Sequence, residues 1–204
     1  MSGNARKPPK ERRRPAMTPE RLRNIAVYYC QRYVVSAGKL ADYLERRLRR
    51  EMTEAEDRAA MAGRIPEIVE SLSRTGLVND GEAASAKLRG ALRAGYAKDA
   101  AVGMAARGAM VEREAVAGAL DRAMADTVPE IAEAEMDRTE EAAALADAAL
   151  RRARRGPYRS RGADEKTQRR DADWLRRRGF RYDAVRRAMR LDGEEFDGDG
   201  EAEA

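Results

Sequence analysis

The sequence predicts an all-α protein: three tandem three-helix repeats that form an elongated, curved helical array. Apolar residues recur at helical spacing, and no run alternates with period two for long enough to propose a strand. Aromatic residues make up only 5% of the 204 residues, so few side chains are large enough to fill a thick globular core. A short apolar pattern also recurs along the chain, which is typical of helical repeat proteins.

The first two predicted helices have clear start signals. Thr18 is a good helix cap, and Pro19 follows it at the first helical position. From there one apolar stripe contains Leu22, Ile25, Ala26, Tyr29 and Tyr33. Ser36 predicts the start of a second helix, whose apolar face carries Leu40, Tyr43, Leu44 and Leu48.

The later helix boundaries are predicted from caps, proline and glycine. Capping-box spacing predicts helix starts at Thr53 with Glu56, at Asn79 with Glu82, and at Thr127 with Glu130. Pro66 predicts a helix start or a kink within the segment 54–75. Glycine favours the left-handed backbone that ends helices, so helix ends are predicted at Gly76, Gly95, Gly108 and Gly179.

An internal repeat organises these helices. Three segments share a β-branched residue, two intervening positions, a small residue and a long aliphatic residue: Ile68-x-x-Ser71-Leu72, Val116-x-x-Ala119-Leu120 and Val185-x-x-Ala188-Met189. A basic-glycine turn precedes two of them, as Met104-x-x-Arg107-Gly108 and Leu175-x-x-Arg178-Gly179. The pattern predicts a repeat domain over 18–190, with units at about 18–76, 77–126 and 127–190. Each unit must stack on a neighbour to bury its apolar face, so we expect a monomer.

The formal net charge of +5 is the sum of four blocks of different sign. Residues 1–17 carry +5 and three prolines, which predicts a disordered basic arm, whereas residues 18–150 carry −4. Residues 151–190 carry +11, and apolar residues such as Trp174 and Leu175 interrupt their arginines. That mixture predicts folded helices with a positive surface. Residues 191–204 carry −7 and are predicted to form a disordered acidic tail.

The residue inventory argues against an enzyme. The chain has no histidine, which removes the commonest general base and every histidine-containing zinc site. Cys30 is the only cysteine, so no intramolecular disulfide and no cysteine metal cage can form. Glycine-rich phosphate-binding motifs are absent. We therefore expect no catalytic residue, no metal and no cofactor. We expect a reducing, cytoplasmic location, and no membrane association because no segment approaches the length of an apolar span.

The candidate functional surface is the arginine-rich block near the C-terminus. Guanidinium groups donate two parallel hydrogen bonds to phosphates and carboxylates, so this block is predicted to contact DNA backbone or acidic protein surface. A solvated surface in an arginine-rich protein is the alternative interpretation. The candidate residues are Arg151, Arg152, Arg154, Arg155, Tyr158, Arg159, Arg161, Arg169, Arg170, Arg176, Arg177, Arg178, Arg186, Arg187 and Arg190.

Aromatic residues in the same block have two readings. Trp174, Phe180 and Tyr182 could stack on nucleic-acid bases, but their position beside Leu175 and a helix-ending glycine favours packing. Tyr158 lies in a Gly-Pro-Tyr-Arg loop, where aromatic residues less often belong to a core. It either anchors the loop or touches a partner.

Three stretches of the sequence, in this order and spacing, resemble the RecX family of recombinase regulators. The first is Tyr28-Tyr29-Cys30-Gln31-Arg32-Tyr33, followed by Ser36 and residues 40–47. The second is Gly76-Leu77-Val78-Asn79-Asp80, followed by Ala83, Ala84, Gly95 and the Arg107-Gly108 turn. The third is Arg155-Gly156-Pro157-Tyr158-Arg159, followed by Leu175-x-x-Arg178-Gly179-Phe180 and Tyr182-Asp183-x-Val185. The chain departs from the family at Val35 and Ala37-Gly38, where charged residues are more common.

The resemblance covers about residues 20–190 and implies a cytoplasmic, all-helical, non-enzymatic modulator of the RecA recombinase. Members of this family lie in the groove of the RecA filament on single-stranded DNA. The expected effect is inhibition of ATP hydrolysis, filament extension and strand exchange, and hence regulation of DNA repair, homologous recombination and the SOS response. The positive surface also predicts weak, salt-sensitive binding to DNA itself. The alternative is a basic helical DNA-binding protein, a nucleoid or transcription factor of the helix-turn-helix type.

Overall fold

The computed structural model describes residues 16–191, and all regular elements among them are helices. The predicted all-α class is therefore confirmed, with no strand in the described part of the chain. Residues 1–15 of the predicted arm and 192–204 of the predicted tail lie outside the described residues. No helix between residues 16 and 191 combines the length and the apolar character that a membrane span requires.

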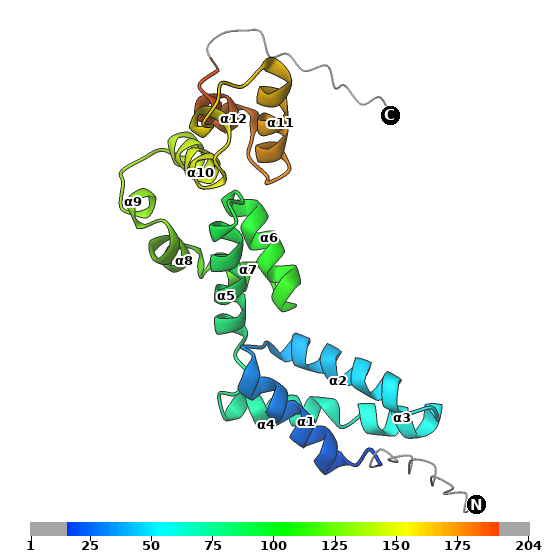
Figure 1. Ribbon diagram of the computed structural model, residues 1–204. Helices are drawn as coiled ribbons and strands as arrows, with labels where there is room; N and C mark the ends of the chain where they lie inside the picture. Colours follow the sequence, from blue (N-terminus) through cyan, green and yellow to red (C-terminus); the bar gives the residue numbers. More distant parts are fainter. Residues whose placement is uncertain (1–15, 192–204) are drawn as a thin grey trace, which may run out of the picture.

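The helices follow one another along an elongated molecule (Figure 1). Helices α1 (Pro19–Arg32), α2 (Ala37–Glu51), α3 (Ala55–Ala62) and α4 (Ile65–Arg74) form one end. The middle contains α5 (Asp80–Arg93), α6 (Lys98–Ala109) and α7 (Arg113–Ala117), and α8 (Leu120–Thr127) and α9 (Pro129–Ala132) lead onward. The other end contains α10 (Arg138–Ala153), a 3-10 turn at Gly156–Tyr158, α11 (Glu165–Arg176) and α12 (Tyr182–Met189).

The buried apolar side chains form two separate clusters. The first lies among α1 to α4, where leucines such as Leu22, Leu40 and Leu44 are fully buried. The second runs continuously from α5 to α12, so the second and third predicted units share it. Alanines such as Ala84 and Ala101 occupy the core between α5 and α6, and their small side chains let the two helices pack closely.

Hydrogen bonds and one close backbone contact join α1–α4 to the rest of the molecule. The Ser36 hydroxyl donates to the carbonyl of Ala109 at the end of α6, and the Asp80 carboxylate accepts from the Ala37 amide at 2.7 Å. Gly38 faces the Met110 backbone so closely that a Cβ atom there would lie 2.8 Å from the carbonyl oxygen. This contact gives a structural reason for glycine at position 38.

A second junction joins α6 to α11. The Ala97 amide donates to the carbonyl of Arg178 at 2.9 Å, next to Gly179, whose φ is +87°. A Cβ atom on Gly179 would lie 2.6 Å from the Cβ of Ala100, so glycine is required both by the backbone angle and by the space.

Several predicted helix boundaries are confirmed. Thr18 and Ser36 cap α1 and α2 through side-chain oxygens that accept backbone hydrogen bonds, and Asn79 caps α5 in the same way. Pro66 lies in the first turn of α4, where its missing N–H costs no hydrogen bond. The helix-ending glycines at positions 76, 95 and 179 all have positive φ.

Other boundary predictions are wrong. A helix capped by Thr53 would begin at residue 54, but α3 begins at Ala55. Glu54, in extended conformation, is the residue before the helix. Thr127 is the last residue of α8, and its buried hydroxyl has no hydrogen-bond partner. Gly108 lies inside α6, which ends at Ala109 and is followed by Met110 in left-handed conformation. In these places tertiary packing overrides the local cap or stop signal.

The aromatic end of the first stripe also differs from the prediction. Helix α1 stops at Arg32, so Tyr33 leaves the helical face and is 55% exposed. Tyr29 stacks on Tyr43 with ring centroids 3.9 Å apart. Cys30 is buried, and desolvation raises the pKa of its thiol.

We expect Gly38→Ala to lower the free energy of unfolding by about 1–3 kcal/mol, because its Cβ would press on the Met110 backbone. The matched control is Gly90→Ala in the exposed interior of α5, where no atom lies within 4 Å of the added Cβ. There the gain in helix propensity should raise stability by about 1 kcal/mol. Urea denaturation of both variants checks the pair. Stabilisation by both substitutions would contradict the close contact.

Candidate functional site

The arginine-rich block folds into the bundle of α10, α11 and α12. Asp137 starts α10 through a full capping box: its carboxylate accepts from the amides of Thr139 and Glu140, and Glu140 accepts from the Asp137 amide. The hydrogen bonds from the Glu140 and Thr139 amides lower the pKa of Asp137. Arg154 ends α10 in left-handed conformation, and the chain then turns through Gly156–Tyr158 into α11.

A buried carboxylate, Asp171, holds the turn between α10 and α11. Its side chain has no exposed surface, and it accepts hydrogen bonds from Arg155 at 2.9 Å, from Arg159 at 2.7 and 2.8 Å, and from the Gly156 amide at 2.8 Å. Burial alone would raise the pKa of Asp171, but these donors outweigh it and hold the pKa at about 2. Asp171 therefore fixes two of the candidate arginines to the bundle.

Tyr158 also belongs to this turn. Its hydroxyl donates to the Asp147 carboxylate of α10, with oxygen–oxygen distances of 2.7 and 2.6 Å, and accepts from Arg151 at 3.2 Å. The ring is partly buried against the second apolar cluster. These contacts favour the anchoring role for Tyr158.

Two further arginines connect the bundle to the middle of the molecule. Arg152 donates to the carbonyl of Arg93 at the end of α5, where a cation also opposes the negative end of the helix dipole. The Arg178 guanidinium lies 3.7 Å from the centroid of the Trp174 ring and 5.2 Å from that of Tyr96. Burial lowers the pKa of Arg178. Arg178 therefore lies at the second junction, whereas Arg152 joins α10 to the end of α5.

The candidate arginines thus separate into two sets. Arg151, Arg152, Arg155, Arg159, Arg169, Arg176 and Arg178 hold contacts inside the protein, among them ion pairs of Arg169 with Glu165 and of Arg176 with Asp173. The remaining guanidinium groups form neither an ion pair nor a hydrogen bond with a described residue, and we call these residues the open arginines. They are exposed and comprise Arg154, Arg161, Arg170, Arg177, Arg186, Arg187 and Arg190.

The aromatic predictions have a mixed outcome. Phe180 is 5% exposed in the core, and Trp174 packs beneath Arg178, as expected for packing residues. Tyr182 is 47% exposed instead, because it is the first residue of α12 and the helix buries the face of Val185 and Met189.

Asp171 is the key residue that the sequence analysis missed. It lies one helical turn before Leu175, on the apolar stripe of α11, and a carboxylate on such a stripe needs buried donors. The arginines on both sides of the Gly-Pro-Tyr turn supply them.

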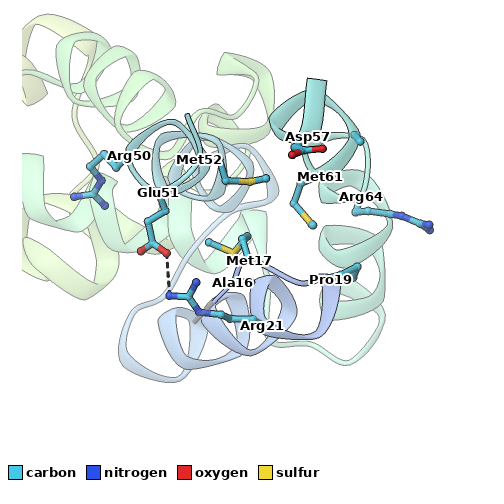
Figure 2. A pocket seen from close by; sticks show the side chains of 11 residues that line it. Ala16, Met17, Pro19, Arg21, Arg50, Glu51, Met52, Asp57, Met61 and Arg64 are labelled. Carbon is cyan, nitrogen blue, oxygen red and sulfur yellow. Dashed lines mark ion pairs between the residues drawn. The ribbon is translucent and has the colours of Figure 1, made fainter. Parts of the chain in front are cut away.

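A second site, also missed, lies at the opposite end of the molecule. A cavity of ≈ 620 Å³ opens between the start of α1, the end of α2 and α3. Figure 2 shows Met17, Met52 and Met61 gathered on one side and the Arg21–Glu51 ion pair of 2.9 Å on the other. Its lining comes from three separate segments, which no sequence motif connects. No cluster of Cys, Asp and Glu within residues 16–191 could hold a metal ion.

The sequence matches no known family model, and a search of curated proteins finds no match. A functional proposal for this chain therefore depends on its residue pattern and on the geometry of the arginine bundle.

We expect Asp171→Asn to lower the free energy of unfolding at pH 7 by about 2 kcal/mol, because Arg155 and Arg159 lose their shared countercharge. The pKa of Asp171 is below its ordinary 3.8, so its contribution is complete above about pH 4 and is lost as the pH falls toward 2. The difference from wild type should therefore shrink over that range in urea titrations.

Asp173→Asn in the same helix is the control for that titration. Asp173 is half exposed and pairs with Arg176 at 3.6 Å, so its loss should cost less than about 0.5 kcal/mol at any pH. Equal effects of the two substitutions would contradict the special role of Asp171.

Proposed function

We propose that this chain is a non-enzymatic regulator of the RecX type, which binds the RecA filament on single-stranded DNA and inhibits its ATPase, extension and strand exchange. The observation that carries the proposal is the set of open arginines on the terminal bundle of an elongated, all-helical molecule. The resemblance of residues 20–190 to that family supplies the partner. On this proposal the protein acts in the cytoplasm as a monomer and regulates DNA repair.

The proposal includes three stacked repeats, with units at about 18–76, 77–126 and 127–190. Support comes from the similarity of the two junctions. In the first, the cap residue of α2, Ser36, donates to the end of α6; in the second, the cap residue of α6, Ala97, donates to the end of α11. A glycine permits the close approach in both, on the capped helix in the first (Gly38) and at the accepting helix end in the second (Gly179). In both junctions the start of one helix therefore packs against the end of the helix that would be its equivalent in the next unit.

An elongated array suits a filament because it reaches more than one protomer. The open arginines would meet acidic protein surface or DNA phosphate, and bridging between protomers would oppose the motions of ATP turnover. Since each neutralised phosphate releases counterions, direct DNA binding should weaken steeply with salt.

A helix-turn-helix DNA-binding protein is the second candidate function. It is favoured by α11 and α12, which are joined by the short turn around Gly179, and by the exposed Arg186, Arg187 and Arg190 on α12. In that case α12 would enter the major groove.

The first test is single-stranded-DNA-dependent ATP hydrolysis by RecA during titration with this protein, with DNA in excess. We expect inhibition well below one molecule per RecA protomer. For the triple variant Arg177→Ala, Arg186→Ala, Arg187→Ala, the same inhibition should need at least about tenfold more protein, because three open arginines are removed and no ion pair or hydrogen bond between described residues is lost.

The control has the same change of net charge elsewhere: Arg50→Ala, Arg93→Ala and Arg122→Ala, all exposed and outside the terminal bundle. This control variant should inhibit ATP hydrolysis as wild type does. An equal loss of inhibition in both triple variants would show that the effect depends on net charge alone. No inhibition up to equimolar wild-type protein would refute the proposal. Sequence-specific duplex binding at physiological salt would then favour the helix-turn-helix candidate.

A further inference from the structure

A small cavity lies where the chain leaves α12. It has a volume of ≈ 280 Å³, enough for one aromatic side chain, and Pro157 and Met189 supply apolar surface. Arg161 and Arg190, two of the open arginines, line it as well, together with Arg159. Arg159 is paired with Asp171, whereas Arg161 and Arg190 form no ion pair with a described carboxylate. The site thus combines an apolar surface with two cations that lack a described countercharge.

The segment that follows has the complementary chemistry. Residues 192–204 carry seven carboxylates, no basic residue and a single large apolar side chain, Phe196. Phe196 is five residues beyond Leu191, a span of about 17 Å when extended, so it can reach back to a cavity that Met189 and Arg190 themselves line. Acidic residues flank it directly at Glu195 and Asp197.

We propose that residues 192–204 bind this cavity of their own chain, with Phe196 against Pro157 and Met189, and with the flanking carboxylates on Arg161 and Arg190. Charge-assisted pairs between guanidinium and carboxylate are strong, and the short connection gives the segment a high effective concentration at the site. The same segment then competes with any external polyanion for the neighbouring open arginines. This docking does not rest on the proposed function.

The direct test is a comparison of backbone amide NMR spectra between the full-length protein and its Phe196→Ala variant at low salt. Shifts should concentrate at the cavity, on Gly156, Gly162, Ala163 and Gln168, and should disappear in 0.5 M salt. An absence of shifts there, or shifts spread over other surfaces, would overturn the proposal. Shifts that grow with protein concentration would also overturn it, in favour of a segment from a second copy.

A binding measurement tests the competition. The probe is a fluorescent 20-nucleotide single-stranded DNA, titrated at low salt with the full chain and with the variant Glu194→Gln, Glu195→Gln, Asp197→Asn. We expect the variant to bind at least about fivefold more tightly, with the difference lost in high salt. The control neutralises three exposed acids outside residues 192–204, by Glu130→Gln, Glu133→Gln and Glu135→Gln, and should change the affinity less than twofold.

Equal tightening by the tail variant and the control would attribute the effect to net charge and overturn the competition. Neither measurement involves the recombinase. Failure of the ATPase test would leave the docking intact, and failure of the docking would leave the ATPase result unaffected.

Discussion

Close approach of helices through small residues is the constraint on which this structure depends. An alanine-rich chain with few aromatic residues buries little surface per residue, so its helices must pack closely to exclude water. Glycine permits that approach at Gly38 and Gly179, where a Cβ atom would overlap the next helix. At both places a hydrogen bond from a cap residue to a helix end fixes the orientation.

In the terminal bundle, charged side chains stabilise the fold in the way that apolar side chains do elsewhere. The buried carboxylate of Asp171 binds the partly exposed Arg155 and Arg159, and Arg178 covers Trp174 at the junction. A basic block of this kind is therefore not one binding surface. Seven candidate arginines hold contacts inside the protein and seven are open to a partner, and substitution of Arg178 would disturb both the junction and any binding measured with it.

The features that the sequence predicted correctly are local ones. The caps Thr18, Ser36 and Asn79 depend on four consecutive residues, and the all-α class depends on short-range periodicity. Thr127 has the same local signal, but it is the last residue of α8 and does not cap the helix that follows. In the candidate site, the role of each arginine depends on contacts with residues that are distant in the sequence, which no local pattern predicts. Arg152 finds its carbonyl acceptor about 60 residues away, and Gly38 meets Met110 across a similar separation.

The division of the buried apolar residues into two clusters has a mechanical consequence. Hydrophobic burial has no direction, whereas hydrogen bonds fix orientation, so the seam between α1–α4 and α5–α12 sets an angle but adds little cohesion. We therefore expect each half to open as its own cooperative unit. A protein bound along an extended partner could then release one half while the other half stays bound. On the proposed function, rebinding of the released half would be an intramolecular step, which would prolong the residence time.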